Sequence, residues 1–189
     1  RLPLTATPIR FASWMGGDRD GHPNVPAKVT SHVLRLARWI AADLYLRDIS
    51  KLTSELSMQN ASAELLAITG ETDEPYRVIL KRLRARMRHT RAALLEAITN
   101  NLPLPADIVH DQNELLEPLL LCHRSLHEVG MSIVADGDLL DSIRRVTTFG
   151  LSLVRMDIRQ DAARHTSALD EMTQWLGLGS YADWSEEQR

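Results

Sequence analysis

The sequence predicts a mainly α-helical chain that contains only two short β-strands. Apolar residues recur at helical spacing through two long stretches, Val25–Ser57 and Pro75–Thr99. Two shorter apolar runs, Ile9–Trp14 and Leu151–Ile158, have the length and composition of buried strands. Glycine, proline and capping residues separate these segments and place further helices between and after them.

The first predicted strand leads into a glycine-rich turn. Glycine allows backbone conformations that a side chain would forbid, and it lets a ligand or another chain approach closely; the glycines are Gly16, Gly17 and Gly21. Arg19 stands between two carboxylates, Asp18 and Asp20, so it could lock the turn through ion pairs or face an anionic substrate. The two carboxylates make a poor site for a hard cation, because further oxygen ligands are missing.

Val25–Ser57 is expected to form one long helix. Pro26 suits its first turn, where the missing N–H costs no hydrogen bond. A short helix follows, with Ser62 as its N-cap and Gly70 at its end. Together these segments predict a helical region directly after the turn.

Pro75–Thr99 is expected to form a second long helix, and its 77–91 segment is basic. That segment carries no acid, and its cations are Arg77, Lys81, Arg82, Arg84, Arg86, Arg88 and Arg91. One hypothesis is a surface that binds an anion or polyanion. The alternative is a solvated face, or one that pairs with acids elsewhere in the protein, and the net charge of −3 favours this alternative.

A third long helix is expected after a loop at Asn101–Val109, where prolines interrupt the pattern. Asp111 and Glu114 resemble a capping box that opens this helix, which runs to about Val129 and is closed by Gly130.

The remaining segments complete the pattern. Asp136 or Asp138 is expected to open a helix that runs to about Phe149. The predicted strand Leu151–Ile158 comes next, and Ala162–Leu176 is expected to be the last helix.

Composition excludes several classes of protein. The chain has 189 residues, of which 44% are hydrophobic and 25% charged, as in ordinary soluble domains. The net charge of −3 argues against a general nucleic-acid binder, and no apolar run is long enough to span a membrane. The single cysteine, Cys122, excludes an internal disulfide and fits a reducing compartment, so we expect a cytoplasmic protein. Both ends look cut, so we expect a fragment.

The histidines do not predict a metal site. His123 and His127 lie four residues apart on a predicted helix and could bind zinc, but the sequence offers no evident third ligand. We therefore predict that the chain holds no metal ion.

Two segments resemble signature motifs of the phosphoenolpyruvate carboxylase family. The first is Ser13–Val25, which reads Ser-Trp-Met-Gly-Gly-Asp-Arg-Asp-Gly-His-Pro-Asn-Val, with His22 where the family commonly has asparagine. The second is Phe149–His165, which contains Asp-Ile-Arg-Gln and Arg-His. The segments 54–57 and 136–141 are also similar to family segments in the same order, so the resemblance covers essentially the whole chain.

The resemblance implies a central fragment of an (α/β)8-barrel (TIM-barrel) enzyme with many extra helices. It divides the chain into a barrel strand and glycine-rich turn at 9–23, a helical excursion at 25–149, a barrel strand at 151–159 and a helix at 162–176. The full-length enzyme would be a lyase of carbon dioxide fixation that makes oxaloacetate and phosphate from phosphoenolpyruvate and bicarbonate, and so feeds the tricarboxylic acid cycle. It would use Mg²⁺ or Mn²⁺ and would form a cytoplasmic homotetramer with no nucleic acid or membrane partner.

The resemblance also assigns roles to particular side chains. Arg159 would hold the substrate phosphate, Trp14 would line a hydrophobic pocket near the reacting carbon, and Arg19 would be the third substrate-binding residue. The residues that shape the site would be Gly16, Gly17, Asp18, Asp20 and Gly21. From the residues alone, other readings stay open: Arg159 could pair with Asp157 or Asp161, and Trp14 could be a core residue.

The resemblance predicts that the isolated chain is inactive. The family's essential histidine, its acidic metal ligands and its mobile loop have no counterpart in the sequence, so no catalytic residue is assigned here. The alternative function, from another class, is a stand-alone helical interaction module that binds an acidic partner through the basic helix 77–91.

Overall fold

The computed structural model describes residues 2–4, 6–21 and 24–188. Within these ranges the chain forms two compact units. The helical unit comprises Arg1–Phe11 and Leu34–Arg155, and the turn unit comprises Ala12–Val33 and Met156–Arg189.

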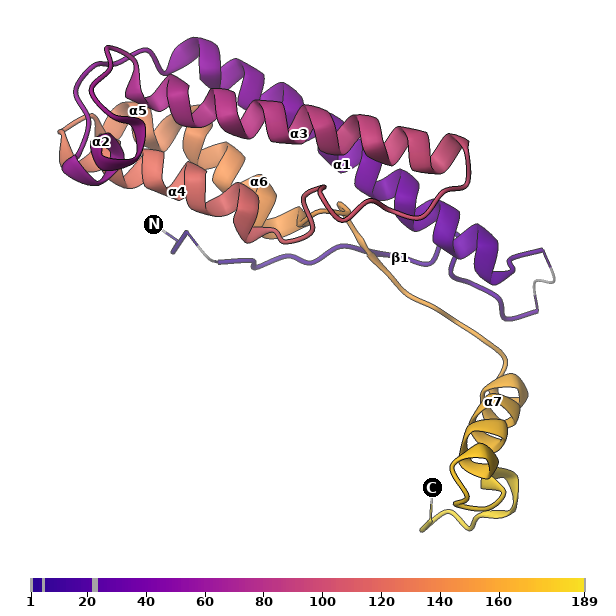
Figure 1. The fold of residues 1–189 in the computed structure, drawn as a ribbon. Helices are drawn as coiled ribbons and strands as arrows, with labels where there is room; N and C mark the ends of the chain where they lie inside the picture. Colours follow the sequence, from indigo (N-terminus) through magenta and orange to yellow (C-terminus); the bar gives the residue numbers. More distant parts are fainter. Residues whose placement is uncertain (1, 5, 22–23, 189) are drawn as a thin grey trace. The chain divides into compact units, whose positions relative to one another are not determined.

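The secondary structure is mainly helical, as predicted (Figure 1). The elements in chain order are β1 (Ala12–Ser13), α1 (Ala27–Glu55), α2 (Ala63–Thr69), α3 (Pro75–Thr99), α4 (Asn113–Glu128), α5 (Ser132–Val134), the π-helical turn η1 (Ala135–Leu139), α6 (Leu140–Phe149), β2 (Arg155–Met156), α7 (Ala162–Trp175) and the 3₁₀ turn η2 (Tyr181–Asp183).

The helical unit is built on long helices that run side by side. Helices α1 and α3 are antiparallel, because Arg77 donates to the carbonyl oxygen of Thr53 (2.8 Å) while Arg91 pairs with Asp43 (3.1 Å), at an earlier point of α1. Figure 1 shows these two helices lying along each other, with α4 and α6 beside them. Burial of their facing apolar side chains supplies the main stabilisation of this unit.

The core of the helical unit draws side chains from all of its long helices. Its largest fully buried side chains are Leu52, Leu65, Tyr76, Leu80, Met87, Leu94, Ile108, Leu115, Leu119, Leu126, Leu139 and Ile143. Tyr76 keeps its hydroxyl paired inside this core, at 3.1 Å from the carbonyl oxygen of Asn60 and 2.9 Å from the hydroxyl of Ser125. That pairing avoids the cost of a buried polar group without a partner.

The predictions for the first helices are confirmed. Helix α3 has the predicted bounds, and α1 lies within two residues of its predicted ends. The hydroxyl of Ser62 accepts from the N–H of Leu65 at 3.3 Å, as an N-cap does, and Gly70 follows the last residue of α2 with a φ of 74°. Capping residues therefore marked these ends correctly.

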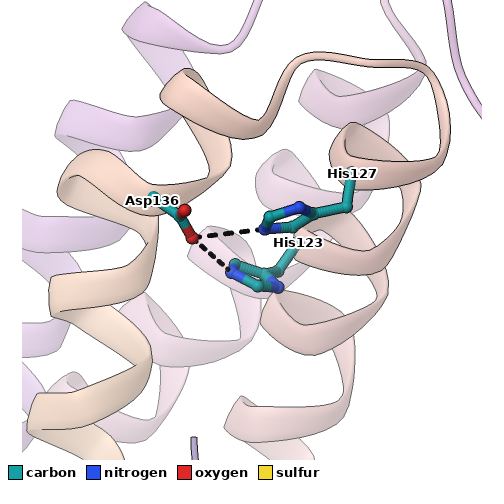
Figure 2. Close-up of side chains that lie close together, drawn as sticks. All are labelled: His123, His127 and Asp136. Atoms are coloured by element: carbon teal, nitrogen blue, oxygen red, sulfur yellow. Dashed lines mark hydrogen bonds and ion pairs between the residues drawn. The ribbon is translucent and has the colours of Figure 1, made fainter. Parts of the chain in front are cut away.

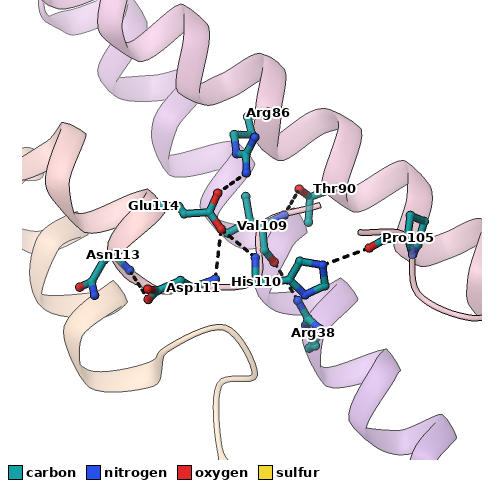
Figure 3. A network of polar contacts seen from close by, with 9 residues as sticks. All are labelled: Arg38, Arg86, Thr90, Pro105, Val109, His110, Asp111, Asn113 and Glu114. Carbon is teal, nitrogen blue, oxygen red and sulfur yellow. Dashed lines mark hydrogen bonds and ion pairs between the residues drawn. The ribbon is translucent and has the colours of Figure 1, made fainter. Parts of the chain in front are cut away.

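The loop between α3 and α4 is tied down at Val109 (Figure 3). The carbonyl oxygen of Val109 accepts from the Arg38 guanidinium at 2.8 Å, and its N–H donates to the Thr90 hydroxyl at 3.0 Å. The loop backbone is thus hydrogen-bonded to both α1 and α3.

The start of α4 confirms half of the predicted capping box (Figure 3). Glu114 accepts from the N–H groups of His110 (2.9 Å) and Asp111 (3.1 Å), and it forms an ion pair with Arg86. Asp111 accepts from the N–H of Asn113 at 2.9 Å, two residues along, instead of from Glu114. The pKa of Glu114 lies below its ordinary value. The largest cause is the hydrogen bond from the backbone N–H of Asp111, followed by the one from His110 and then by Arg86.

The prediction that Asp136 or Asp138 opens the next helix is wrong. The chain is already helical from Ser132, and the wide turn η1 carries it into α6. Gly137, with φ −90° and ψ −132°, breaks the helical geometry inside η1. A glycine can take this conformation, so the aspartates lie around a bend and do not cap a new helix.

Both strands are shorter and more exposed than predicted. Leu151–Val154 forms a turn ahead of β2, in which Leu153 has a φ of 64°. Ile9 and Ile158, predicted inside buried strands, lie outside β1 and β2 and are 61% and 58% exposed. In the described residues β1 and β2 form a two-stranded sheet, so each has only one strand neighbour to pair with.

Three of the seven cations on the basic face of α3 form ion pairs within the described residues. Ion pairs link Arg77 to Glu74, Arg86 to Glu114 and Arg91 to Asp43. These contacts favour the interpretation of a face that pairs with acids of the same protein. Among the described residues, no helix is both long and apolar enough to cross a membrane.

Candidate functional site

The candidate site is the glycine-rich turn after β1, which lies in the turn unit. The carbonyl oxygen of Trp14 accepts from the N–H groups of Gly17 (2.8 Å) and Asp18 (2.9 Å), which closes a tight turn. Gly16 has a φ of +78°, a conformation that side chains disfavour, and a Cβ there would lie 2.7 Å from a methyl group of Val33. The backbone and its neighbours therefore require glycine at this position.

Backbone pairing holds the turn against the segment after β2. Arg19 donates its N–H to the carbonyl oxygen of Arg159 (2.8 Å), and Arg159 donates to the carbonyl oxygen of Gly17 (3.0 Å), so Asp18 and Arg159 form a parallel bridge. A Cβ on Gly17 would lie 2.3 Å from the carbonyl oxygen of Asp157. Only glycine allows the two segments to approach this closely.

The side chain of Arg159 lies over the ring of Trp14. Its guanidinium carbon is 5.1 Å from the ring centroid, which is cation–π distance. Its Nη1 lies 3.5 Å from a carboxylate oxygen of Asp18, and both side chains are partly exposed. The prediction placed Arg159, Trp14 and Asp18 in one site, and the structure brings these three side chains together.

The alternative readings of Arg159 and Trp14 find no support in the described residues. Asp161 caps α7 by accepting from the N–H of Ala163 at 2.7 Å, and within the described residues Arg159 forms its ion pair with Asp18 and not with Asp157. Trp14 is 60% exposed, so it is not a core residue of the described chain.

Arg19 points into the turn instead of pairing with its flanking aspartates. Its guanidinium donates to the hydroxyl of Thr30 (2.8 Å), and that hydroxyl donates to the carbonyl oxygen of Gly16 (2.7 Å). Within the described ranges, its Nε is buried without a hydrogen-bond partner. Arg19 and the buried Thr30 thus connect the turn to the first residues of α1. Of the two readings of Arg19, the lock through ion pairs is not seen in the described part of the turn.

The turn does not provide a site for a hard cation. Asp20 donates its N–H to Asp18 at 3.3 Å, and Asp18 also faces the guanidinium of Arg159, so its carboxylate is already shared. Mg²⁺ and Mn²⁺ prefer several oxygen ligands, which these two aspartates do not supply. His22 and Pro23 lie outside the described residues, so the departure at His22 has no structural account.

A second group of side chains gathers in the helical unit (Figure 2). His123 and His127 extend from α4 toward Asp136 of η1, with Nε2–Oδ1 distances of 3.4 and 3.2 Å. The expectation that the two histidines lack a third ligand is wrong, because the chain turns back after α4 at Gly130, which has a φ of 78°, and so brings Asp136 beside α4.

Sequence reasoning missed two residues, Thr30 and Asp136. Thr30 lies on an otherwise ordinary helix start, and its role depends on the fold of the turn, which no local pattern shows. Asp136 had a signal in its Asp-Gly-Asp sequence, where the glycine indicates a bend, but the pattern was interpreted as a helix start.

Comparison with known proteins agrees with the motifs of this site. A model of the family described as phosphoenolpyruvate carboxylase matches residues 1–189. The chain is 61% identical over 189 residues to the phosphoenolpyruvate carboxylase of Ectopseudomonas mendocina and 62% identical over 188 residues to that of Pseudomonas fluorescens Pf-5. The enzyme of Pseudomonas aeruginosa is 59% identical over 189 residues. Each match covers 100% of this chain and 22% of the relative's length. The chain belongs to the phosphoenolpyruvate carboxylase family.

Proposed function

We propose that the full-length protein carboxylates phosphoenolpyruvate with bicarbonate and releases oxaloacetate and phosphate. In this proposal the chain is a central part of an (α/β)8-barrel enzyme, of which β1 and β2 are two strands. Active-site groups of such barrels gather at the carboxyl ends of the strands, where the glycine-rich turn and Arg159 follow β1 and β2. The proposed full-length enzyme is a cytoplasmic homotetramer.

One observation carries the proposal: the guanidinium of Arg159 is held over Trp14 with its donors partly exposed. A guanidinium presents two parallel N–H donors that match a phosphate in geometry and charge. The distance of 3.5 Å to Asp18 exceeds the roughly 2.7–2.9 Å of a strong charge-assisted hydrogen bond. A partly exposed pair of this kind is worth about 0–1 kcal/mol, so a phosphate dianion can replace Asp18 as the partner of Arg159.

Trp14 would act as the apolar wall of the same pocket. Its exposed ring lies beneath the arginine, and Met15 beside it is 74% exposed, so the two side chains offer apolar surface next to the guanidinium. Carbon dioxide and an enolate need protection from water, and an apolar surface next to the phosphate arginine provides it.

The divalent metal of the reaction, Mg²⁺ or Mn²⁺, would be held by residues outside this chain. The shared carboxylate of Asp18 and the single further carboxylate of Asp20 do not fit such an ion. In this proposal the chain binds and orients the substrate phosphate and shields the reacting carbon, and it does not hold the metal.

The alternative of a stand-alone module that binds an acidic partner is less well supported. Arg77, Arg86 and Arg91 on the basic face of α3 already form ion pairs with acids of the same chain. A partner would have to displace these contacts.

Kinetics of Arg159 variants in the full-length enzyme test the proposal. Arg159→Ala should lower kcat/KM by roughly thirty- to a thousandfold, which corresponds to about 2–4 kcal/mol, because a charge-assisted phosphate contact is lost. Arg159→Lys should recover only part of this activity, since an ammonium cannot make the two-pronged contact. Arg144→Ala, an exposed arginine on α6 outside the two motifs, is the matched control and should leave kcat/KM near the wild-type value.

The opposite pattern would remove Arg159 from the substrate site. If Arg159→Ala lowers the Tm while the remaining folded enzyme keeps its KM and kcat, then Arg159 is a structural residue.

The isolated chain should form no oxaloacetate from bicarbonate above a matched blank. Turnover that Arg159→Ala abolishes would show that this chain contains more of the catalytic machinery than we propose.

A further inference from the structure

The cluster of His123, His127 and Asp136 has the arrangement of a metal site (Figure 2). The two histidines lie four residues apart, so they project from the same face of α4. Asp136 faces them from η1. Each of the three side chains offers one ligand atom, and these three atoms lie within 4.8 Å of one another. None of the described residues of the candidate substrate site takes part.

One nitrogen of the cluster lacks a hydrogen bond. Nε2 of His123 is buried, and within the described residues no hydrogen-bond partner satisfies it. Asp136 lies within ion-pair distance at 3.4 Å, but the contact is not aligned as a hydrogen bond. The His123 side chain is only 9% exposed, so water has little access to compensate. A buried polar atom without a partner is costly, and a bound ion would satisfy it.

The two distances from the histidines to Asp136 fit a tetrahedral ion. Zinc binds imidazole nitrogen and carboxylate oxygen at about 2.0–2.2 Å, which keeps ligand atoms of a tetrahedron about 3.3–3.6 Å apart. The Nε2–Oδ1 distances of 3.4 Å for His123 and 3.2 Å for His127 are close to this range. The side chains would therefore need only small movements to coordinate an ion.

The ligand types select the class of metal. Imidazole nitrogen suits late first-row divalent ions such as Zn²⁺, Co²⁺ and Cu²⁺, whereas Mg²⁺ and Ca²⁺ take oxygen ligands. Three protein ligands leave a fourth position, which a water molecule fills in many sites of this kind.

We propose that His123, His127 and Asp136 bind a late first-row divalent metal ion, of which Zn²⁺ is the best fit. The ion joins α4 to η1 across the turn at Gly130. Its effect is to fix the position of η1 and α6 on α4, since a metal bond replaces a weak contact between a carboxylate and two imidazoles.

The test measures metal binding to the full-length protein after removal of bound metal. Zn²⁺ affinity is measured by competition with a chromophoric chelator, and Co²⁺ is added separately as a spectroscopic probe of tetrahedral geometry. The variants are His127→Gln, whose side chain is partly exposed, and Asp136→Asn. The matched control is His89→Gln, because His89 also pairs with a carboxylate, Asp107 at 2.9 Å, but lies outside the cluster.

The wild-type protein and His89→Gln should bind one more Zn²⁺ ion than either cluster variant. Affinity at this site should fall by more than the roughly 10- to 100-fold that changes in outer-shell partners cause. The visible absorption of tetrahedral Co²⁺ should disappear in the cluster variants, and Zn²⁺ should raise the Tm of the wild type but not of these variants. Far-UV circular dichroism of each variant confirms that the fold is kept.

Three results would overturn the proposal. Equal Zn²⁺ stoichiometry and affinity in the wild type and both cluster variants would show that the ion binds elsewhere. An equal loss in His89→Gln would show a general effect of removing a histidine. A wild-type protein that binds Zn²⁺ without the tetrahedral Co²⁺ spectrum would show that these three residues do not coordinate together, and the cluster would then be a carboxylate that hydrogen-bonds a histidine.

Discussion

The helical unit and the turn unit are stabilised in different ways. In the helical unit, side chains such as Leu80 and Leu115 are completely buried, and apolar contacts dominate. The candidate site in the turn unit has an exposed Trp14 and depends on backbone hydrogen bonds between the turn and Arg159.

This difference predicts how each unit responds to substitution. A core tolerates changes of shape at a cost in stability, because neighbouring side chains relax only in part. A turn defined by close backbone approach tolerates almost no added atom at the points of approach. Substitutions in the helical unit should therefore lower stability, and substitutions in the turn should lower activity.

The largest effect on stability is expected for Leu115→Ala. The side chain is fully buried in α4, so its truncation should cost about 2–5 kcal/mol. Hydrogen exchange of α4 amides in the full-length protein measures the local loss of stability. The folded enzyme should keep its kcat/KM. A large loss of kcat/KM with unchanged exchange would erase the distinction between the two units.

Gly17→Ala should show the opposite pattern. The new Cβ would lie 2.3 Å from the carbonyl oxygen of Asp157, which is backbone and cannot rotate away, so the turn must separate from the Arg159 segment. We expect kcat/KM to fall by about a hundredfold, or about 2.7 kcal/mol, with little change in hydrogen exchange of α3 and α4.

Gly21→Ala is the matched control for this change. Nothing lies within 4 Å of a Cβ at Gly21, although its φ of +64° still costs an alanine about 1–2 kcal/mol of strain. Its loss of kcat/KM should be clearly smaller. Equal losses in the two variants would mean that backbone strain, and not the contact with Asp157, defines the turn.

A smaller, pH-dependent effect is expected for Glu114→Gln at the start of α4. Backbone N–H groups and Arg86 hold the pKa of Glu114 below its ordinary value of 4.5, so the folded state favours the charged carboxylate. The stabilisation is present above pH 4.5 and is lost as the pH falls through the lowered pKa. The variant should be less stable by about 0.5–1 kcal/mol at pH 7. The difference in Tm should shrink at acid pH, and a difference that stays constant with pH would assign the effect to packing.

The smallest effect is expected for Cys122, which lies within the core. The side chain is fully buried, and burial raises the pKa of its thiol to about 12. The thiolate is the reactive form, so a thiol reagent at pH 8 should not label Cys122 in the native protein. Peptide mapping by mass spectrometry should find the label only after denaturation. Rapid native labelling would show that this part of the core opens readily.

The accuracy of the sequence predictions also differs between the two units. Helix α3 was predicted to the residue, because its apolar spacing and Pro75 mark the element locally. The strands were predicted too long, because alternation of apolar residues shows which face a strand could bury, but not how many of its residues find a partner. The early start at Ser132 was missed, since Gly137 indicated a boundary where the structure has a bend.

Candidate site residues were predicted where a motif carries them, and missed where only the fold does. Motif resemblance placed Arg159 and Trp14 in one substrate site, and in the structure the Arg159 side chain lies over the Trp14 ring. Thr30 and Asp136 act through contacts with residues distant in space that no spacing rule connects. Their roles follow from backbone geometry, which the local sequence does not specify.

The backbone pairing of Asp18 with Arg159 also determines the order in which the chain can fold. It closes a loop that contains every helix from α1 to α6, and loops of this length close slowly compared with local helix contacts. During synthesis the glycine-rich turn leaves the ribosome long before residue 159, so the helices can fold while β1 still lacks its partner. In that interval the edge of β1 is open to other nascent chains. Substitutions that slow the folding of the helices should therefore reduce the yield of soluble protein even when the mature enzyme is fully active.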